Sequence, residues 1–396
     1  MPVKPPSLAV LVAITALNPF ALNILQPALP DLARTFATDY GTVQLTLALY
    51  LVTSAVAQLG IGPLSDRIGR RPVALGGLLI YVAGSLACIA ATSIETLVLG
   101  RVVQAVGGIA GFVISRVVIR DLYERDAAAS RIGYVMMAMV VAPMVAPLFG
   151  GLLAEQTGHV GVFAFTAAVG LGAFVFALID LRETRRVVEH AAALTLARAF
   201  AVLMANPVFL AHALTMGFTA ATFFSFIAGS PYVVVELQGR GPTIYGVWFF
   251  AVSSSYMFGN FLSGRISERV GTRTMAYAGT GLSLLGSLFL AAGYALVPDE
   301  PAVFFLSTIP IWVGNGLTLP AATASALSVR PDLAGAAAGF SGAIHLGTAA
   351  LSAYVTGHVL AGSAWPMIAI MIATTAIALL SHFIAEDGLP AWRRGA

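Results

Sequence analysis

The sequence predicts an all-α integral membrane protein with twelve transmembrane helices in two pseudosymmetric six-helix bundles. Three observations predict this fold class. The chain has 396 residues, of which 58% are hydrophobic and only 10% are charged, whereas soluble domains carry about 25% charged residues. Apolar runs recur along the whole chain, and a charged loop motif occurs twice. Lipid must therefore be the solvent for most of the outer surface.

A helix needs about 20 mainly apolar residues to cross a bilayer, and the chain offers twelve such segments. Period-two alternation is absent, which favours helices over the strands of a membrane barrel. The first segment resembles a signal peptide but continues past Asn23 without a convincing cleavage site, so we interpret it as a membrane helix. The predicted spans are 8–28, 43–63, 72–92, 97–119, 132–153, 160–181, 207–229, 244–263, 274–297, 302–324, 335–359 and 365–385.

Positive charge is distributed unevenly between the two faces. If both termini are cytoplasmic, every Lys and Arg falls in a cytoplasmic segment except Arg34 and Arg240 outside and Arg101 and Arg116 within helices. This bias follows the positive-inside rule and predicts a multi-pass protein of the bacterial inner membrane with cytoplasmic termini. The longest cytoplasmic connection is basic and partly amphipathic. The predicted domains are an N-terminal bundle at 1–181, a linker at 182–206 and a C-terminal bundle at 207–396.

The loop motif follows the second helix of each predicted half. GPLSDRIGRR at 62–71 aligns without a gap with GRISERVGTR at 264–273. A generic basic turn does not account for an acid, two glycines and two arginines shared at fixed offsets. Small residues permit close helix approach and tight turns, and charges that pair in one conformation bias a two-state equilibrium. We therefore expect a conformational gate that contains Gly62, Asp66, Arg67, Gly69, Arg70, Arg71, Glu268 and Arg269.

The fourth span carries charge inside an apolar run. Arg101, Gln104, Gly108 and Ser115 lie within roughly 60° on a helical wheel and form one polar stripe. An arginine within a membrane costs about 2.5–3.5 kcal/mol, so it should face a cavity or a partner; the alternative is snorkelling to the headgroups. Arg116 lies nearer the cytoplasmic end.

The fifth span contains APMVAPLFGG at 142–151. Pro143, Pro147 and Gly151 are spaced four apart on one face, beside Gly150. Proline removes a backbone hydrogen bond, and glycine lets helices pack closely. The alternative is an ordinary kinked helix.

These features together resemble the major facilitator superfamily over essentially the whole chain. The resemblance implies that Asp66, Arg70 and Asp121, the acid that ends the fourth helix, lock the outward-open state. Thr272 replaces Arg70 in the second copy, which implies a weaker clamp there. The R-x-x-Q pattern at 101–104 resembles a motif that serves proton transfer in antiporters, although Ala105 stands where glycine is usual.

Two further segments narrow the resemblance. RDLY at 120–123 with APMVAPLFGG, and QPALPDLARTF at 26–36, are similar to the Bcr/CflA subfamily of drug:proton antiporters, whose known members export bicyclomycin or chloramphenicol. Relatives commonly carry an acid where this chain has Asn23, and none of its acids lies near a helix midpoint. Proton-linked candidates are Arg101, Asp31 and His345; substrate-cavity candidates are Asn23, Gln26, Gln104, Arg116 and Asn315.

The function that we expect is secondary active efflux of small amphipathic or hydrophobic molecules, coupled to proton influx by alternating access. We find no catalytic constellation, nucleotide-binding loop or metal cluster, and the single cysteine excludes a disulfide or a cysteine metal site. We therefore expect no enzyme activity, no cofactor and no nucleic-acid partner, and a monomer driven by the proton gradient. The alternatives are a proton-linked carrier for a sugar, nucleoside or amino acid, and, less favoured, a polytopic membrane enzyme.

Overall fold

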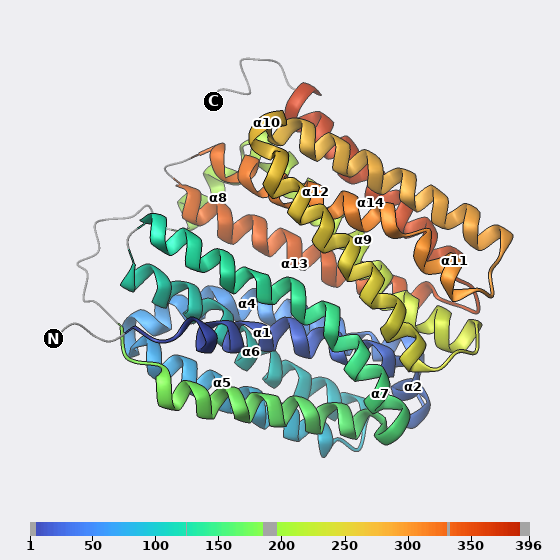
Figure 1. Ribbon diagram of the computed structural model, residues 1–396, viewed down its shortest axis with the longest axis horizontal. Coiled ribbons are helices and arrows are strands. Elements are labelled where there is room, and N and C mark those ends of the chain that lie inside the picture. The colour runs from blue at the N-terminus through green and yellow to red at the C-terminus, as the bar shows by residue number, and fades with distance from the viewer. Residues whose placement is uncertain (1–4, 124, 185–195, 331–332, 389–396) are drawn as a thin grey trace. The chain divides into compact units, whose positions relative to one another are not determined.

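The computed structural model describes residues 5–123, 125–184, 196–330 and 333–388, and this part of the chain is helical without strands. Figure 1 shows the helices in chain order. They are α1 (Leu8–Ile24), η1 (Gln26–Ala28), α2 (Leu29–Thr35), α3 (Tyr40–Val43), α4 (Leu45–Ile68), α5 (Arg70–Ile89), α6 (Ile94–Leu122), α7 (Arg125–Asp180), α8 (Leu196–Met204), α9 (Pro207–Tyr232), η2 (Val233–Leu237), α10 (Pro242–Leu296), α11 (Pro301–Leu306), α12 (Ile309–Ser328), α13 (Ala334–Val359), α14 (Trp365–Phe383) and η4 (Ile384–Gly388).

The predicted spans coincide with these helices. Among the described residues, 9 helical stretches are long and apolar enough to cross a membrane. Two of them, α7 and α10, each hold two predicted spans separated by a non-helical glycine, Gly158 or Gly271. The Ala- and Gly-rich α13 holds the remaining predicted span, 335–359. The predicted all-helical membrane fold is therefore confirmed.

Local sequence sets where several helices begin. The Ser7 hydroxyl accepts a hydrogen bond from the Val10 amide at the start of α1, and Ser93 forms a capping box with Thr96 at the start of α6. Asn206 caps α9 just before Pro207. Polar side chains at these positions satisfy amides that have no partner within the helix, and proline is well tolerated at the first helical position.

The helices group into two compact units. Unit 1 contains Met1–Glu189 and the short segment Arg240–Val247, and unit 2 contains His190–Gly239 and Trp248–Ala396. In unit 1, α5 packs against α6 and α1 packs against α7; in unit 2, α9 packs against α13 and α14. The predicted linker 182–206 lies partly outside the described residues, and its last part forms α8.

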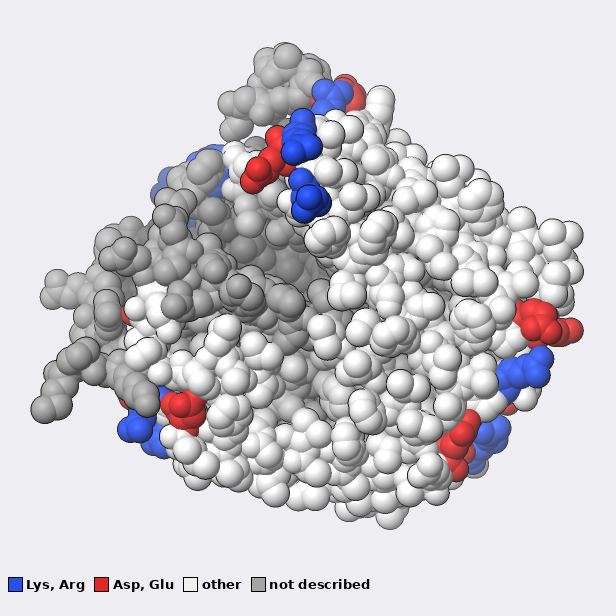
Figure 2. Space-filling model, viewed as in Figure 1, with Lys and Arg blue, Asp and Glu red and all other residues white. Residues whose placement is uncertain are grey.

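The surface over the helices is apolar, as a lipid-embedded chain requires. Exposed large hydrophobic side chains include Leu99, Ile179, Phe261 and Leu351, each more than 60% exposed. On the face in Figure 2, charged side chains gather near helix ends, and the surface over the middle of the helices is uncharged. Exposed apolar area of this extent indicates contact with lipid.

The two copies of the loop motif share one backbone feature. Gly69, between α4 and α5, has φ +108°, and Gly271, at the corresponding place in α10, has φ +80°. Both values lie in a region that glycine enters freely and other residues avoid. The sequence repeat therefore corresponds to a structural repeat, with the same sharp break after the second helix of each half.

We predict that Gly271→Ala destabilises the protein by about 1–2 kcal/mol, because alanine is strained at positive φ. A Cβ on Gly271 would meet no atom within 4 Å, so crowding does not contribute. Gly264→Ala is the matched control on the same helix, with equally open space and helical backbone; it should stabilise by up to about 1 kcal/mol. Thermal unfolding in detergent compares the two, and equal stabilities would contradict the assigned strain.

Candidate functional site

A charged clamp, formed by Asp66, Arg70 and Asp121, joins the end of α4, the start of α5 and the end of α6. The Arg70 guanidinium contacts the Asp66 carboxylate at 2.5 Å through Nη1 and the Asp121 carboxylate at 2.9 Å through Nε. Nη1 also donates a hydrogen bond to the Ser65 hydroxyl at 2.7 Å. Arg70 is only 4% exposed. A buried guanidinium held by two carboxylates is much harder to separate than a surface ion pair.

A third acid, Glu183, strengthens this corner of unit 1. The Glu183 carboxylate accepts hydrogen bonds from the backbone amides of Arg70 at 2.9 Å and Arg71 at 3.2 Å. It thus satisfies free donors at the positive N-terminus of α5. The Arg71 side chain in turn donates to the carbonyls of Leu181 and Leu178, both at 2.9 Å, where α7 ends. Sequence analysis missed Glu183. The only signal for it in the sequence is its position shortly after the sixth span.

The structure differs from expectation at Gly62. A Cβ at this position would meet no atom within 4 Å, so the close helix approach expected there is not observed. The glycine expected to allow a tight turn, Gly69, does have the backbone that requires it. Arg67 is exposed on the same loop.

The second copy of the loop has no counterpart of the two Arg70 ion pairs, and its charged contact is instead between Arg273 and Asp387. At the position of Arg70 stands Thr272, whose hydroxyl accepts a hydrogen bond from Ser325 of α12 at 3.4 Å. Glu268 and Arg269 are exposed and make no ion pair within the described part of the chain. A long contact between two hydroxyls thus replaces the two ion pairs of the first copy.

Arg101 lies fully inside unit 1, with 1% exposure. Its Nη1 donates to the Ala21 carbonyl at 3.1 Å and to the Gln104 side-chain oxygen at 2.5 Å. The guanidinium also lies over the Tyr50 ring, 4.2 Å from its centroid. Gln104 donates onward to the Ser85 hydroxyl at 2.7 Å. Snorkelling is thereby excluded: Arg101 is held by carbonyl oxygens and a ring, with no carboxylate partner among the described residues.

The polar residues of the first helix form a short chain of hydrogen bonds. Asn23 donates to the Pro19 carbonyl and Gln26 donates to the Asn23 side-chain oxygen, both at 2.6 Å. The Tyr245 hydroxyl donates to the Gln26 oxygen at 2.7 Å. All three polar side chains are buried. Tyr245 belongs to the short segment of unit 1 at the start of α10, and no sequence signal connected it to the first helix.

The glycines of α7 lie where backbones meet. A Cβ on Gly150 would lie 2.9 Å from the Ile24 carbonyl carbon, and one on Gly151 would lie 2.7 Å from the Pro242 oxygen. Pro147 is buried and Pro143 half-buried on the same helix. Only glycine fits at such contacts, so this motif is more than an ordinary proline kink.

Comparison with known proteins identifies the family. Residues 11–253 match the family model of the Major Facilitator Superfamily. The chain belongs to the Major Facilitator Superfamily. It is also 30% identical to the chloramphenicol resistance protein of Pseudomonas aeruginosa, over 92% of this chain and 88% of that protein.

Other relatives of this major facilitator agree with the assignment. The bicyclomycin resistance protein homolog of Haemophilus influenzae is 26% identical, over 93% of each chain. The fold is similar to that of a bacterial homologue of the human lysosomal transporter Spinster, with a TM-score of 0.76, 18% identity and 96% of each chain covered. The predicted resemblance to the Bcr/CflA subfamily is confirmed. The chain is thus a multi-pass membrane protein of a family of transporters rather than enzymes.

The remaining candidates of this major facilitator each have their own local contacts. Asp31, in the first turn of α2, pairs with Arg34 at 3.8 Å and is partly exposed. Arg116 lies over the Phe112 ring, 3.9 Å from its centroid. In unit 2, His345 lies on α13, and its Nδ1 has no hydrogen-bond partner within the described residues.

Asn315 lies in a polar seam within unit 2. Its side-chain oxygen accepts a hydrogen bond from Ser283 at 3.1 Å, and its amide nitrogen lies 3.5 Å from the Thr219 carbonyl. Thr222 and Thr375 line the same narrow space. Short hydroxyl side chains and an amide therefore satisfy one another between α9, α10, α12 and α14.

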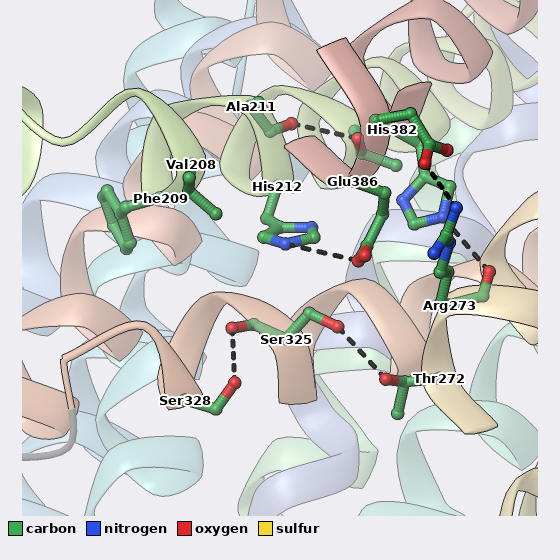
Figure 3. Close-up of polar contacts among 12 residues, drawn as sticks. Val208, Phe209, Ala211, His212, Thr272, Arg273, Ser325, Ser328, His382 and Glu386 are labelled. Atoms are coloured by element: carbon green, nitrogen blue, oxygen red, sulfur yellow. Dashed lines mark hydrogen bonds and ion pairs between the residues drawn. The ribbon is translucent and has the colours of Figure 1, made fainter. Parts of the chain in front are cut away.

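A further cluster in unit 2 brings together α9, near the start of the unit, and α14 with η4, near its end. His212 of α9 and Glu386 of η4 face each other with 3.7 Å between Nε2 and Oε1, and His382 of α14 lies beside them (Figure 3). Sequence analysis did not single out this cluster. The available signal was the four-residue spacing of His382 and Glu386, which places both on one face of a helix.

Proposed function

We propose that this major facilitator exports small amphipathic or hydrophobic drugs in exchange for protons, by alternating access. The observation that carries the proposal is the buried clamp of Asp66, Arg70 and Asp121 in the first loop copy. The names of the relatives, a chloramphenicol resistance protein and a bicyclomycin resistance protein homolog, support drugs as the substrate class. The glycine and proline residues of α7 belong to the segment APMVAPLFGG, which resembles the Bcr/CflA drug:proton antiporters, and this resemblance supports export.

In this proposal the clamp acts as a latch for one of two states. Charges that are buried and paired in one conformation must be hydrated or paired differently in the other, so the clamp contributes to the free-energy difference between them. The weaker hydroxyl contact of Thr272 and Ser325 contributes far less. The latch is therefore asymmetric, and unit 1 controls it.

Three residues are candidates for proton coupling, and their surroundings differ. Arg101 is held by the Ala21 carbonyl and Gln104, and Asp31 is near Arg34. His345 has an imidazole nitrogen without a hydrogen-bond partner in the described part of the chain. It could accept a proton without first breaking a hydrogen bond of that nitrogen. We therefore place His345 first, with Arg101 as a fixed charge that organises unit 1.

The proton gradient suffices as the energy source, with no cofactor. One charge that moves across 100 mV releases about 2.3 kcal/mol, which supports a substrate gradient of about fifty-fold. The distribution of Lys and Arg supports a topology with both termini and the two loop copies on the cytoplasmic side of the inner membrane. We propose a monomer as the working unit.

The proposal predicts drug resistance that depends on the proton gradient. Expression in an efflux-deficient bacterial host should raise tolerance to chloramphenicol and other hydrophobic antibiotics, and a protonophore should remove the effect. Growth inhibition and accumulation of labelled chloramphenicol measure the outcome, with the Arg70→Ala variant at equal membrane level as the inactive control. Unchanged sensitivity across a broad panel would instead favour a metabolite carrier.

A further inference from the structure

The cluster of His212, His382 and Glu386 has the composition of a metal site. Each residue offers one ligand atom, and the three ligand atoms lie within 4.8 Å of one another. His212 is 4% exposed and His382 is fully buried, while the Glu386 side chain is 22% exposed. Figure 3 shows the three side chains directed toward one another from α9, α14 and η4. Two imidazoles and a carboxylate are typical ligands of zinc and related divalent metals.

The hydrogen bond of His382 defines which of its nitrogens is available. Its Nε2 lies 3.2 Å from the Arg273 carbonyl oxygen, and because a carbonyl can only accept, Nε2 carries the proton. In the neutral ring Nδ1 then holds a lone pair, and this buried atom has no hydrogen-bond partner within the described residues. Metal-binding histidines commonly donate their other N–H to a backbone carbonyl in this way, which orients the ring.

The imidazole of His212 also has a nitrogen without a hydrogen-bond partner among the described residues. His212 Nδ1 is buried and has no hydrogen-bond partner in the described part of the chain, while Nε2 is 3.7 Å from Glu386. That distance exceeds a hydrogen bond. Buried polar atoms are nearly always satisfied, so two imidazoles with unpartnered nitrogens in one cluster need an explanation. A cation held by His382 Nδ1, His212 Nε2 and Glu386 would account for the unpartnered nitrogen of His382 and would use the His212 nitrogen that faces Glu386.

The charges around the cluster favour a cation. Arg273, whose carbonyl oxygen contacts His382, has its guanidinium paired with Asp387. The Tyr277 hydroxyl donates to Asp387 at 2.5 Å, and the Tyr277 ring lies edge-on to His382, with 4.4 Å between the centroids. Glu386 supplies a further negative charge beside two neutral rings. Of these described charged groups, two are carboxylates and one is a guanidinium.

The fold itself does not require this cluster. At the offset of the loop repeat, the corresponding residues of unit 1 are Val10, Asp180 and Thr184. There the Asp180 carboxylate accepts a hydrogen bond from the Ser7 amide at 2.7 Å. The same pair of helices thus closes in unit 1 without histidine.

We propose that His212, His382 and Glu386 bind one divalent transition metal of the zinc class, which fastens the start of α9 to the end of α14. Zinc lies about 2.0–2.2 Å from nitrogen and oxygen ligands, so the side chains must draw together slightly on binding. Glu386 lies in a π-helical turn, η4, a type of turn that often occurs at functional sites. Three protein ligands leave a fourth position for water.

Metal titration of the purified, tag-free full chain tests this proposal. After chelator treatment, CoCl₂ should bind at one ion per chain with the visible absorption of a low-coordinate site, and ZnCl₂ should displace it and raise the thermal midpoint. Glu386→Gln and His382→Asn should each weaken binding at least ten-fold. His358→Asn is the matched control on an exposed histidine of the same unit and should bind as the unaltered chain does.

Two results would overturn the proposal: no saturable Co²⁺ or Zn²⁺ binding by the unaltered chain, or equal affinity in the Glu386→Gln and His382→Asn variants. Because Glu386 is partly exposed, its isosteric replacement should leave the fold intact even if the histidine variant does not fold. Binding and thermal midpoint are measured without drug transport. Failure here would therefore leave the proposed export function untouched, and failure of export would leave the metal site untouched.

Discussion

Replacement of Arg70 by alanine is expected to abolish transport at normal membrane levels. The change removes both ion pairs of the clamp and leaves the Asp121 carboxylate, whose side chain is 14% exposed, without its guanidinium. Loss of one partner of a buried pair costs about 3–5 kcal/mol, and we expect about 3 kcal/mol because Asp66 is 43% exposed. A free-energy change of about 3 kcal/mol shifts the equilibrium constant between two conformations more than one hundred-fold. Proton-driven drug uptake into inside-out vesicles measures the loss.

Arg67→Ala is the matched control for this prediction, because Arg67 lies on the same loop and is exposed. It should retain most transport. Asp66→Asn should give an intermediate loss, since it weakens one of the two ion pairs and keeps the shape of the side chain. Normal transport by Arg70→Ala or Asp66→Asn, with normal membrane levels, would refute the role of the clamp as a gate.

Arg101→Ala is expected to cause the second largest effect, on both stability and transport. The Ala21 carbonyl and the Gln104 oxygen would lose their donor in a buried setting, at about 1–3 kcal/mol for each unsatisfied group. The contact with the Tyr50 ring would also be lost. We therefore expect a lower thermal midpoint in detergent and transport reduced at least ten-fold.

The Arg101→Lys variant tests whether the positive charge at this position suffices or whether the planar guanidinium is required. Lysine keeps the positive charge but lacks the planar fork that reaches two acceptors and stacks on a ring. We expect it to recover part of the stability and little of the transport, whereas Arg265→Ala, at an exposed arginine of α10, should change neither. If Arg101→Lys transports normally, the charge alone suffices and the fork geometry is not needed.

Much of the candidate site could be predicted from local sequence. The clamp residues Asp66 and Arg70 are four apart at a helix end, and the glycine between α4 and α5 is the one that the turn requires. Arg101 and Gln104 share a helical face and do contact one another. In each case the interacting groups are close in sequence, or a spacing rule relates them.

The partners of these groups were harder to predict. Glu183 reaches the start of α5 from beyond the sixth span, and Tyr245 reaches Gln26 from the start of α10. Ala21 and Tyr50 meet Arg101 from two other helices. Such contacts depend on which helix faces lie together. A hydropathy pattern gives the length of a helix but not its rotation or its neighbours.

The sequence alone determined that this chain is a duplicated membrane bundle. Lipid contains no water to pair with the backbone, so apolar segments must form helices, and the loop motif at 62–71 is repeated at 264–273. Only the tertiary structure decided which polar groups meet. It brought His212 and the pair His382 and Glu386 together across more than 160 residues of chain, and it paired Thr272 with Ser325 of α12. The physical reason is that burial and side-chain contact arise from the packing of helices that are distant in sequence, on which no local pattern bears.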